Sequence, residues 1–444
     1  MKKTWLTNII AIGMLLYSAG AVAQQRNEFS VKQAVDYGMK NTVQVKNALL
    51  DVKIQEQVNR QITSAAYPQV NGSINFTDYF DIPTSLVPGE FVGQPAGTYK
   101  AFSFGTKYNA SGGFDVSQLL FDGQVFVGLV ARNAVLSFYQ KTAEVTQEQI
   151  KANIYKIYYQ LVVGKKQITS LDANIDRFEK LLSDTREIFK NGFAEKLDVD
   201  KVNVQLNNLR TEKIKAENMI AVGNSGLKFL MGMPQKDELV LTDTLSDEEL
   251  KMNILDSAYD YKNRKEFQLL TIAEKLGNYN IKRYKLSKLP TIAAFASYQK
   301  NAQRPTFDFF GNGNWFTTSL AGFKITVPIF DGNKKNALIQ QSRLELQKTQ
   351  NNIEQLKLNI DADVEQSRLK MTSALLTVDN QKKNISLAEN VYNTTKLKYE
   401  QGLGSNQEIY NAQAELKVAQ TNYYSSLYDA INAKIDWLKA TGKL

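Results

Sequence analysis

Apolar and polar residues alternate with a period of two in two long stretches of the first half of the chain. Between Val70 and Phe80, and again between Phe102 and Leu120, apolar residues recur at even positions with small polar residues between them. Alternation of this kind predicts strands with one apolar and one polar face. Two stretches of the second half repeat the pattern less regularly. The four predicted strands span residues 69–81, 102–121, 291–300 and 315–330.

A different period, of 3.5 residues, runs through the segments that follow these strands. Steps of four and three residues lead from Ile150 to Phe189, and in a copy displaced by 210 residues from Ile360 to Tyr399, mostly through apolar positions. Such a sustained repeat is typical of coiled-coil packing, and an ordinary bundle core explains two proline-free segments of this length less well. The predicted long helices span 124–191 and 333–401, their return helices 197–232 and 406–441, and the shorter helices before the strands 30–66 and 252–287.

The two halves of the chain repeat the same order of motifs. The segment "LLFDGQ" at 119–124 matches "PIFDGN" at 328–333, and "AYPQVNGSINF" at 66–76 matches "KLPTIAAFASY" at 288–298. We interpret this order as a tandem duplication of about 210 residues. The predicted organisation is a signal peptide at 1–23, a first repeat at 24–234, an equatorial inter-repeat segment at 235–251 and a second repeat at 252–444.

A glycine interrupts the helical pattern at matching points of the two repeats. In "IFKNGFAEKLDVD" at 188–200 the glycine is Gly192, and in "KYEQGLGSNQEIY" at 398–410 it is Gly402. Glycine accepts a positive φ, so it can end one helix and let the next begin almost at once. Each break therefore predicts a narrow turn between a long helix and its return helix, and a plain helix C-cap is part of the same explanation.

The composition excludes several classes of enzyme. The 444 residues include no histidine and no cysteine, so histidine bases, Ser-His-Asp triads, cysteine nucleophiles and histidine or thiolate metal sites are excluded. No clustered motif for a carboxylate-pair hydrolase or for lysine chemistry is present, and we predict no enzymatic activity and no cofactor. The net charge of +9 is mild for this length, and the basic residues are interleaved with acids, which argues against nucleic-acid binding.

The N-terminus has the pattern of an export signal. Lys2 and Lys3 precede an apolar run that ends in Ala21-Val22-Ala23, so we predict cleavage between Ala23 and Gln24. A membrane anchor is the alternative, but the apolar run is too short to cross ~30 Å of hydrocarbon. No apolar run of 18 residues follows the signal, so any part of the mature chain inside a membrane has to consist of strands.

Four strands from one chain cannot close a barrel, and open edges in lipid leave backbone groups without partners. Three copies would supply twelve strands around an aqueous lumen lined by the polar strand face. A soluble sandwich would also show alternation. The strand lengths, the export signal and the connections at 81–101 and 301–314 favour the membrane barrel, so the predicted fold class is an α+β membrane protein.

In the duplicated order of its motifs, the chain resembles the TolC-like outer-membrane efflux proteins, also called outer membrane factors. The resemblance covers essentially all of the mature chain, and the duplicated order of its motifs is more specific than any one of them. The motifs that carry it are the helix-to-strand junctions Tyr67-Pro68 and Leu289-Pro290, the strand-to-helix turns Phe121-Asp122-Gly123 and Phe330-Asp331-Gly332, and the closing "LMG" and "ATG".

The resemblance implies a homotrimer with a twelve-stranded β-barrel in the outer membrane and a helical tunnel in the periplasm. Its implied partners are outer-membrane lipid, a periplasmic adaptor (membrane fusion) protein and an inner-membrane pump of the RND or ABC type. The implied function is a passive exit duct of a tripartite efflux or type I secretion system. The alternatives are an exported coiled-coil structural or adhesin-like protein anchored by a trimeric barrel, and a soluble periplasmic binding module.

The resemblance also assigns the adaptor contact to the two glycine turns. The family's tip motif has an aromatic residue three positions before a glycine and an acid six positions after it. The corresponding residues and their neighbours here are Phe189, Gly192, Phe193, Asp198 and Lys201 in the first repeat, and Tyr399, Gly402, Gly404, Ser405, Glu408 and Asn411 in the second.

Family members carry a second acid one turn later, which completes a charged ring at the tunnel entrance. This chain has Asn411 at that position and Lys201 at its first-repeat counterpart. We therefore expect at most one ring, of three Glu408 carboxylates, with a mild preference for cations. A solvated glutamate on a helix face is the alternative.

Overall fold

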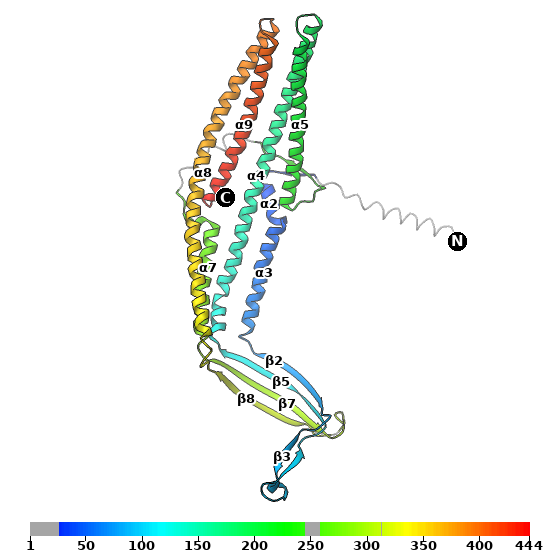
Figure 1. Cartoon of the computed structure of the whole chain (residues 1–444), viewed down its shortest axis with the longest axis vertical. Coiled ribbons are helices and arrows are strands. Elements are labelled where there is room, and N and C mark those ends of the chain that lie inside the picture. The colour runs from blue at the N-terminus through cyan, green and yellow to red at the C-terminus, as the bar shows by residue number, and fades with distance from the viewer. Residues whose placement is uncertain (1–25, 245–257, 312) are drawn as a thin grey trace, which may run out of the picture. The chain divides into compact units, whose positions relative to one another are not determined.

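The structure, a computed structural model, describes residues 26–244, 258–311 and 313–444 (Figure 1). The predicted signal peptide and its cleavage position between Ala23 and Gln24 lie outside these residues. The chain forms two compact units. The first comprises Met1–Asp51, Gln140–Leu269 and Ile353–Leu444, and the second comprises Val52–Tyr139 and Leu270–Asn352. Two long helices, α4 (Gly123–Lys190) and α8 (Lys334–Glu400), contribute residues to both units.

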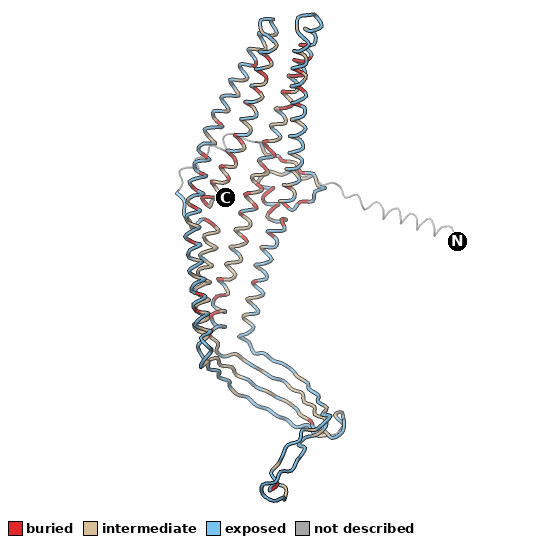
Figure 2. The backbone as a smooth tube through the Cα atoms, viewed as in Figure 1, coloured by how far each residue is buried: buried red, intermediate tan, exposed pale blue. Residues whose placement is uncertain are grey.

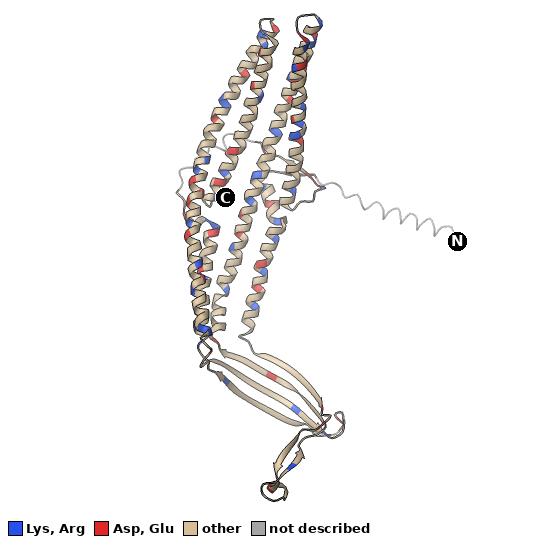
Figure 3. Cartoon of the chain, in the orientation of Figure 1, with Lys and Arg blue, Asp and Glu red and all other residues tan. Residues whose placement is uncertain are grey.

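The helices that flank the two glycine breaks agree closely with the sequence pattern. α4 and α8 are followed by the return helices α5 (Lys196–Met231) and α9 (Asn406–Ala440), and all four begin and end within one residue of the predicted bounds. Lys and Arg are interleaved with Asp and Glu along these helices (Figure 3). The division of the chain into two sequence repeats stays a prediction.

The shorter helices differ from the prediction. In place of one helix over 30–66, α2 (Val31–Asn41) and α3 (Val43–Ser64) are separated at Thr42, which has a ψ of 128°. The Thr42 hydroxyl donates to the Leu230 carbonyl at 2.8 Å, so the break is held by a contact with α5. In the second half, a short 3₁₀ turn at Tyr261–Asn263 precedes α7 (Lys265–Leu286). The segment 252–257 of the predicted helix lies outside the described residues.

Four antiparallel strands of the second unit form one sheet in the order β2-β5-β7-β8. The strands are β2 (Gln69–Asp78), β5 (Tyr108–Phe121), β7 (Thr291–Arg304) and β8 (Phe316–Thr326). The register confirms the predicted faces, since Val70 lies opposite Val116 on the apolar face and Asn75 lies opposite Ser111 on the polar one. The central pair, β5 and β7, joins the two halves of the chain and leaves β2 and β8 at the edges.

The prediction of one strand over 102–121 was wrong. β4 (Tyr99–Ser103) pairs with β3 (Thr84–Pro88) in a separate hairpin, and β5 begins only at Tyr108. Gly105, with a φ of +132°, redirects the chain between them. The alternation of apolar residues continues through the break, so the pattern could not reveal it.

The ends of the other strands also differ. β7 extends to Arg304 rather than 300, because it keeps its pairing with β5 as far as Tyr108. β8 ends at Thr326 rather than 330. Pro328 has no backbone N–H to continue a ladder, which explains this early end. β2 likewise ends at Asp78 rather than 81.

The first unit contains a small sheet that the sequence analysis did not predict. β1 (Arg26–Phe29) pairs in parallel with β6 (Glu238–Leu241), which lies in the predicted inter-repeat segment. The Tyr158 hydroxyl of α4 donates to the Phe29 carbonyl at 2.8 Å. The β1 strand is thereby fixed to α4 and to the connection between the two halves.

Buried residues lie in separate clusters along the helices (Figure 2). One cluster packs α2, α4 and α5 against the β1–β6 sheet around Ile154, Tyr158 and Leu227. Another joins α4, α5, α8 and α9 around Phe178 and Leu416. By contrast, α8 exposes a series of leucines. These are Leu344, Leu358, Leu369, Leu376, Leu387 and Leu397. No helix among the described residues is both long and apolar enough to cross a membrane.

Candidate functional site

The turn between α4 and α5 closes around Gly192. This glycine has a φ of +80°, as the sequence pattern predicts. Its N–H donates to the Phe189 carbonyl at 2.9 Å, and the Phe193 N–H donates to the Ile188 carbonyl at 3.0 Å. These two bonds define a Schellman motif, which satisfies carbonyls at the end of a helix and requires a left-handed residue.

The turn between α8 and α9 has the same hydrogen bonds. Gly402 has a φ of +73°, its N–H donates to the Tyr399 carbonyl at 3.0 Å, and the Leu403 N–H donates to the Lys398 carbonyl at 2.9 Å. A β-carbon added at Gly192 or Gly402 would meet no atom within 4 Å. Both glycines are therefore required by backbone conformation and not by lack of space.

The aromatic residues of the two tip motifs have different environments. Phe189 is 42% exposed, whereas the ring of Tyr399 packs against the cluster around Phe178. Burial raises the pKa of Tyr399, and the carboxylates of Asp184 and Asp198 raise it further. Tyr399 thus stabilises the turn from inside and offers little surface to a partner.

The residues directly after the glycines are the exposed apolar groups of the turns. Phe193 is 85% exposed and Leu403 is 78% exposed. The sequence analysis included Phe193 but missed Leu403. Its position, one residue after Gly402, was the signal that could have identified it. Each turn therefore presents one exposed apolar side chain surrounded by polar residues.

The first turn of each return helix is capped by a side chain of the predicted set. The Asp198 carboxylate accepts from the Glu195 N–H at 3.3 Å, and the Ser405 hydroxyl accepts from the Glu408 N–H at 3.2 Å. Both contacts satisfy N–H groups that have no partner within a helix. Glu408 itself is exposed in the first turn of α9, where the helix dipole favours an anion.

A row of polar side chains connects the two return helices next to their turns. Lys201 Nζ of α5 lies 3.5 Å from Gln407 Oε1 of α9, and Gln407 Nε2 donates to Asn411 Oδ1 at 2.9 Å. The structure therefore joins Lys201 and Asn411 through Gln407, a residue that the sequence analysis missed. The two turns are held as a pair by this contact and by the apolar cluster behind it.

The two predicted strand-to-helix turns use their glycines in different ways. Asp122 Oδ1 accepts from the N–H groups of Gln124 and Val125 at 2.7 and 3.1 Å, and a β-carbon on Gly123 would lie 2.5 Å from the Leu286 carbonyl oxygen. The first turn needs its glycine for close packing against α7.

In the second turn, the Asp331 carboxylate accepts from the Lys335 N–H at 3.1 Å. Gly332 has a φ of +65°, and an added β-carbon there would meet no atom within 4 Å. This turn needs its glycine for the left-handed backbone conformation, so the same three-residue motif meets two different requirements.

Comparison with known proteins finds similarity to outer-membrane efflux proteins. A family model described as "outer membrane efflux protein" matches residues 261–443. A curated relative, outer membrane efflux protein BepC of Brucella suis biovar 1 (strain 1330), is 22% identical over 454 residues that cover 98% of this chain and 90% of BepC. The second half of the chain thus matches the outer membrane efflux proteins, and the whole chain is similar to BepC.

Solved structures show that this chain has the fold of outer-membrane channels. CusC matches with a TM-score of 0.76 at 16% identity, over 93% of this chain and 92% of CusC. The CmeC channel of Campylobacter jejuni matches with a TM-score of 0.74 at 15% identity, over 96% of this chain and 91% of CmeC. At this level of identity the matches establish the fold alone. The roles of individual site residues are argued from the geometry of this chain.

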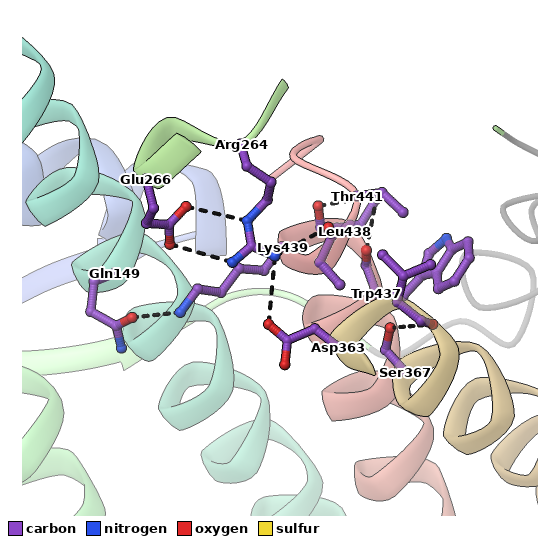
Figure 4. A network of polar contacts seen from close by, with 11 residues as sticks. Gln149, Arg264, Glu266, Asp363, Ser367, Trp437, Leu438, Lys439 and Thr441 are labelled. Atoms are coloured by element: carbon purple, nitrogen blue, oxygen red, sulfur yellow. Dashed lines mark hydrogen bonds and ion pairs between the residues drawn. The ribbon is translucent and has the colours of Figure 1, made fainter. Parts of the chain in front are cut away.

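A second polar cluster of the chain lies at the C-terminal end of α9 (Figure 4). The Arg264 side chain is 6% exposed; its Nε and Nη2 lie 3.2 and 3.5 Å from the two carboxylate oxygens of Glu266, and its Nη1 donates to the Ala440 carbonyl at 3.2 Å. Asp363 of α8 lies 3.6 Å from the same guanidinium. No motif of the sequence indicated this cluster, because its members come from three separate segments.

A buried glutamate adjoins this cluster. Glu148 of α4 is 9% exposed, and its Oε2 has no hydrogen-bond partner among the described residues. Burial raises its pKa, and repulsion from Glu266 adds to the effect. One turn earlier, burial also acts to raise the pKa of Glu144, but hydrogen bonds from Lys141 and Lys265 outweigh it and lower the pKa.

Proposed function

We propose that this protein is the passive exit duct of a tripartite export machine in the outer membrane. Substrates would enter it from a periplasmic adaptor and an inner-membrane pump and leave to the exterior. The observation that carries the proposal is the β2-β5-β7-β8 sheet, which has an exposed apolar face and a polar face. Ile74 and Phe323 on the apolar face are 90% and 73% exposed, which suits contact with lipid.

Trimer formation follows from the edges of this sheet. β2 and β8 each have one side without a partner strand in the described chain, and such edges in lipid would cost several kcal/mol for each unpaired backbone group. Three copies would close a twelve-stranded barrel with the polar face toward an aqueous lumen. The exposed leucines of α8 supply a further apolar surface that neighbouring protomers could cover.

The adaptor contact is assigned to the two glycine turns. Phe193 and Leu403 provide exposed apolar side chains, and Glu408 and Lys201 provide charges of opposite sign beside them. Hot spots of interfaces are formed by apolar anchors of this kind within a polar rim. The pump would be of the RND or ABC type, and it would determine which substrate is exported.

The family consists of channel proteins, and a passive duct requires no chemistry of its own. The prediction that the chain is not an enzyme agrees with this role. The comparisons give no support to an adhesin-like or structural function.

One preparation tests the proposal. The protein purified in detergent should have the mass of a trimer, and it should form ion-conducting pores when added to a planar lipid bilayer. A monomer that remains soluble without detergent and forms no pores would contradict the exit-duct function.

A further inference from the structure

A cavity of about 580 Å³ lies on the polar face of the sheet, near the β3–β4 hairpin. Its floor consists of two rows of paired residues across β2, β5 and β7. Asn75, Ser111 and Asn301 form one row, and Thr77, Asn109 and Gln303 form the next. Every lining residue belongs to one protomer and to the second unit.

The walls of the cavity come from the segments that lead into and out of the hairpin. Tyr79, Ile82 and Pro83 contribute one wall, and Phe104, Gly105 and Thr106 contribute another. Phe316 of β8 also lines the cavity. Phe104 and Phe316 are 63% and 60% exposed, so their rings are free to contact a ligand.

The floor is rich in unused hydrogen-bonding groups. Among the described residues, the side chains of Asn75, Thr77, Ser111 and Gln303 have no hydrogen-bond partner. Asn109 is held by Thr106 at 3.2 Å, and Asn301 donates to Thr318 at 3.4 Å. Amides and hydroxyls both donate and accept, so a ligand with several hydroxyl groups could pair with all four unpaired side chains.

Among the described residues, no charged side chain lines the cavity. An ionic ligand would therefore lose hydration without gaining a counter-charge, which is unfavourable. A neutral ligand that combines many hydroxyls with apolar C–H faces would instead use both the amides and the aromatic rings. The volume is within the range of about 300 to 1,000 Å³ that is usual for small-molecule sites.

We propose that this cavity binds a neutral saccharide at the hairpin end of the sheet. The proposal goes beyond conduction and does not require the trimer, because one chain supplies the whole site. The sugar could be a free oligosaccharide in the lumen or the saccharide chain of a glycolipid that enters the lumen from the mouth of the barrel, because the polar face is turned away from the surrounding lipid. Both sources have the same hydroxyl chemistry, and the experiment separates them.

The test is calorimetric titration of the full-length mature protein in detergent. The first arm uses maltotriose, chitotriose and mannotriose, and the second uses lipopolysaccharide with a complete O-chain in mixed micelles. Saturable binding of a free trisaccharide identifies a soluble sugar, and binding only in the second arm identifies a glycolipid. The absence of saturable binding in both arms would overturn the proposal.

Matched variants locate the site. The double variant Asn75→Ala, Asn301→Ala should weaken binding at least tenfold. The control Asn71→Ala, Ser297→Ala changes residues on the same polar face that lie outside the cavity, and it should bind as the unchanged protein does. Equal weakening by both variants would also overturn the proposal. Trimer mass should be unchanged in both variants. Pore formation by the unchanged protein in a planar bilayer is measured separately, so a failure of sugar binding can be distinguished from a failure of the exit-duct function.

Discussion

At the scale of single residues, the two tip glycines show how a local conformation shapes the candidate site. Gly192 and Gly402 have left-handed φ values and open space around them. The substitution of either one by alanine would therefore introduce backbone strain without any steric clash.

We expect Gly402→Ala to reduce stability by about 1 to 2 kcal/mol, the cost of the left-handed conformation for a residue with a β-carbon. The matched control is Gly226→Ala in α5, where the glycine has helical backbone and an added β-carbon meets no atom within 4 Å. There alanine should stabilise by about 0.5 to 1 kcal/mol. Thermal unfolding of both variants measures the direction of the two stability changes. A loss of stability in the control would show that the reason given for Gly402 is wrong.

The neighbouring acids Glu148 and Glu144 should respond to pH in opposite ways. The pKa of Glu148 is raised above its ordinary value of 4.5, so its ionised form destabilises the folded state at neutral pH. Glu148→Gln removes that charge and should raise the melting temperature at pH 8. The gain should vanish below about pH 4, where glutamate is protonated in the folded and the unfolded chain.

Glu144 provides the control on the same helix. Its pKa is lowered, so its ionised form stabilises the fold above the ordinary value of 4.5, and this stability is lost as the pH falls through the folded pKa. Glu144→Gln should therefore lower the melting temperature at pH 8 and have less effect in acid. A change of melting temperature in the same direction for both variants at pH 8 would contradict the environments assigned to Glu148 and Glu144.

At the scale of elements, Arg264 connects segments that are far apart in sequence. Its guanidinium joins the start of α7, the last carbonyl of α9 and Asp363 of α8 (Figure 4). Burial acts to raise the pKa of Glu266, and the hydrogen bond and charge of Arg264 lower it. Removal of the Arg264 cation would therefore leave the Glu266 carboxylate partly buried without its partner.

We expect Arg264→Gln to destabilise the first unit by about 2 to 3 kcal/mol, somewhat less than the loss of a fully buried ion pair, because Glu266 keeps contact with water. Hydrogen exchange at the C-terminal end of α9 should increase in this variant. Arg368→Gln is the control, because Arg368 pairs with Glu365 on the exposed face of α8. The control should show no measurable change, and equal effects would argue against a specific role for Arg264.

At the scale of the whole molecule, the two glycine turns and the β2-β5-β7-β8 sheet have different roles in the proposed function. The exposed apolar residues of the turns would contact the adaptor, and the sheet would form the pore. We expect the double variant Phe193→Asp, Leu403→Asp to form trimers and to conduct ions as before, because both side chains are exposed. Binding to the adaptor should fall at least tenfold, since two apolar anchors are lost.

Co-purification with the adaptor and planar-bilayer conductance measure the two properties separately. The variant Val204→Asp is the control, since it replaces an exposed apolar residue of α5 by aspartate away from the turns. Unchanged adaptor binding in the double variant would exclude the turns as the main contact.

Much of the fold could be predicted from the sequence, since it depends on neighbouring residues. The helices on both sides of Gly192 and Gly402 were placed within one residue, because a 3.5-residue period and a glycine that accepts positive φ are both local properties. The polar and apolar faces of β2 and β5 were correct for the same reason, as a period of two directs alternate side chains to opposite faces.

Only the tertiary structure decided where distant segments meet. The pairing of β1 with β6, the separation of β4 from β5, and the cluster of Arg264, Glu266 and Asp363 each depend on residues that no local pattern connects. The same holds for the two glycine turns, where the packing of α4, α5, α8 and α9 partly buries Tyr399 and leaves Phe193 and Leu403 exposed. Periodicity determines which face of an element is apolar, whereas exposure, charge environment and cavities arise only when the elements pack.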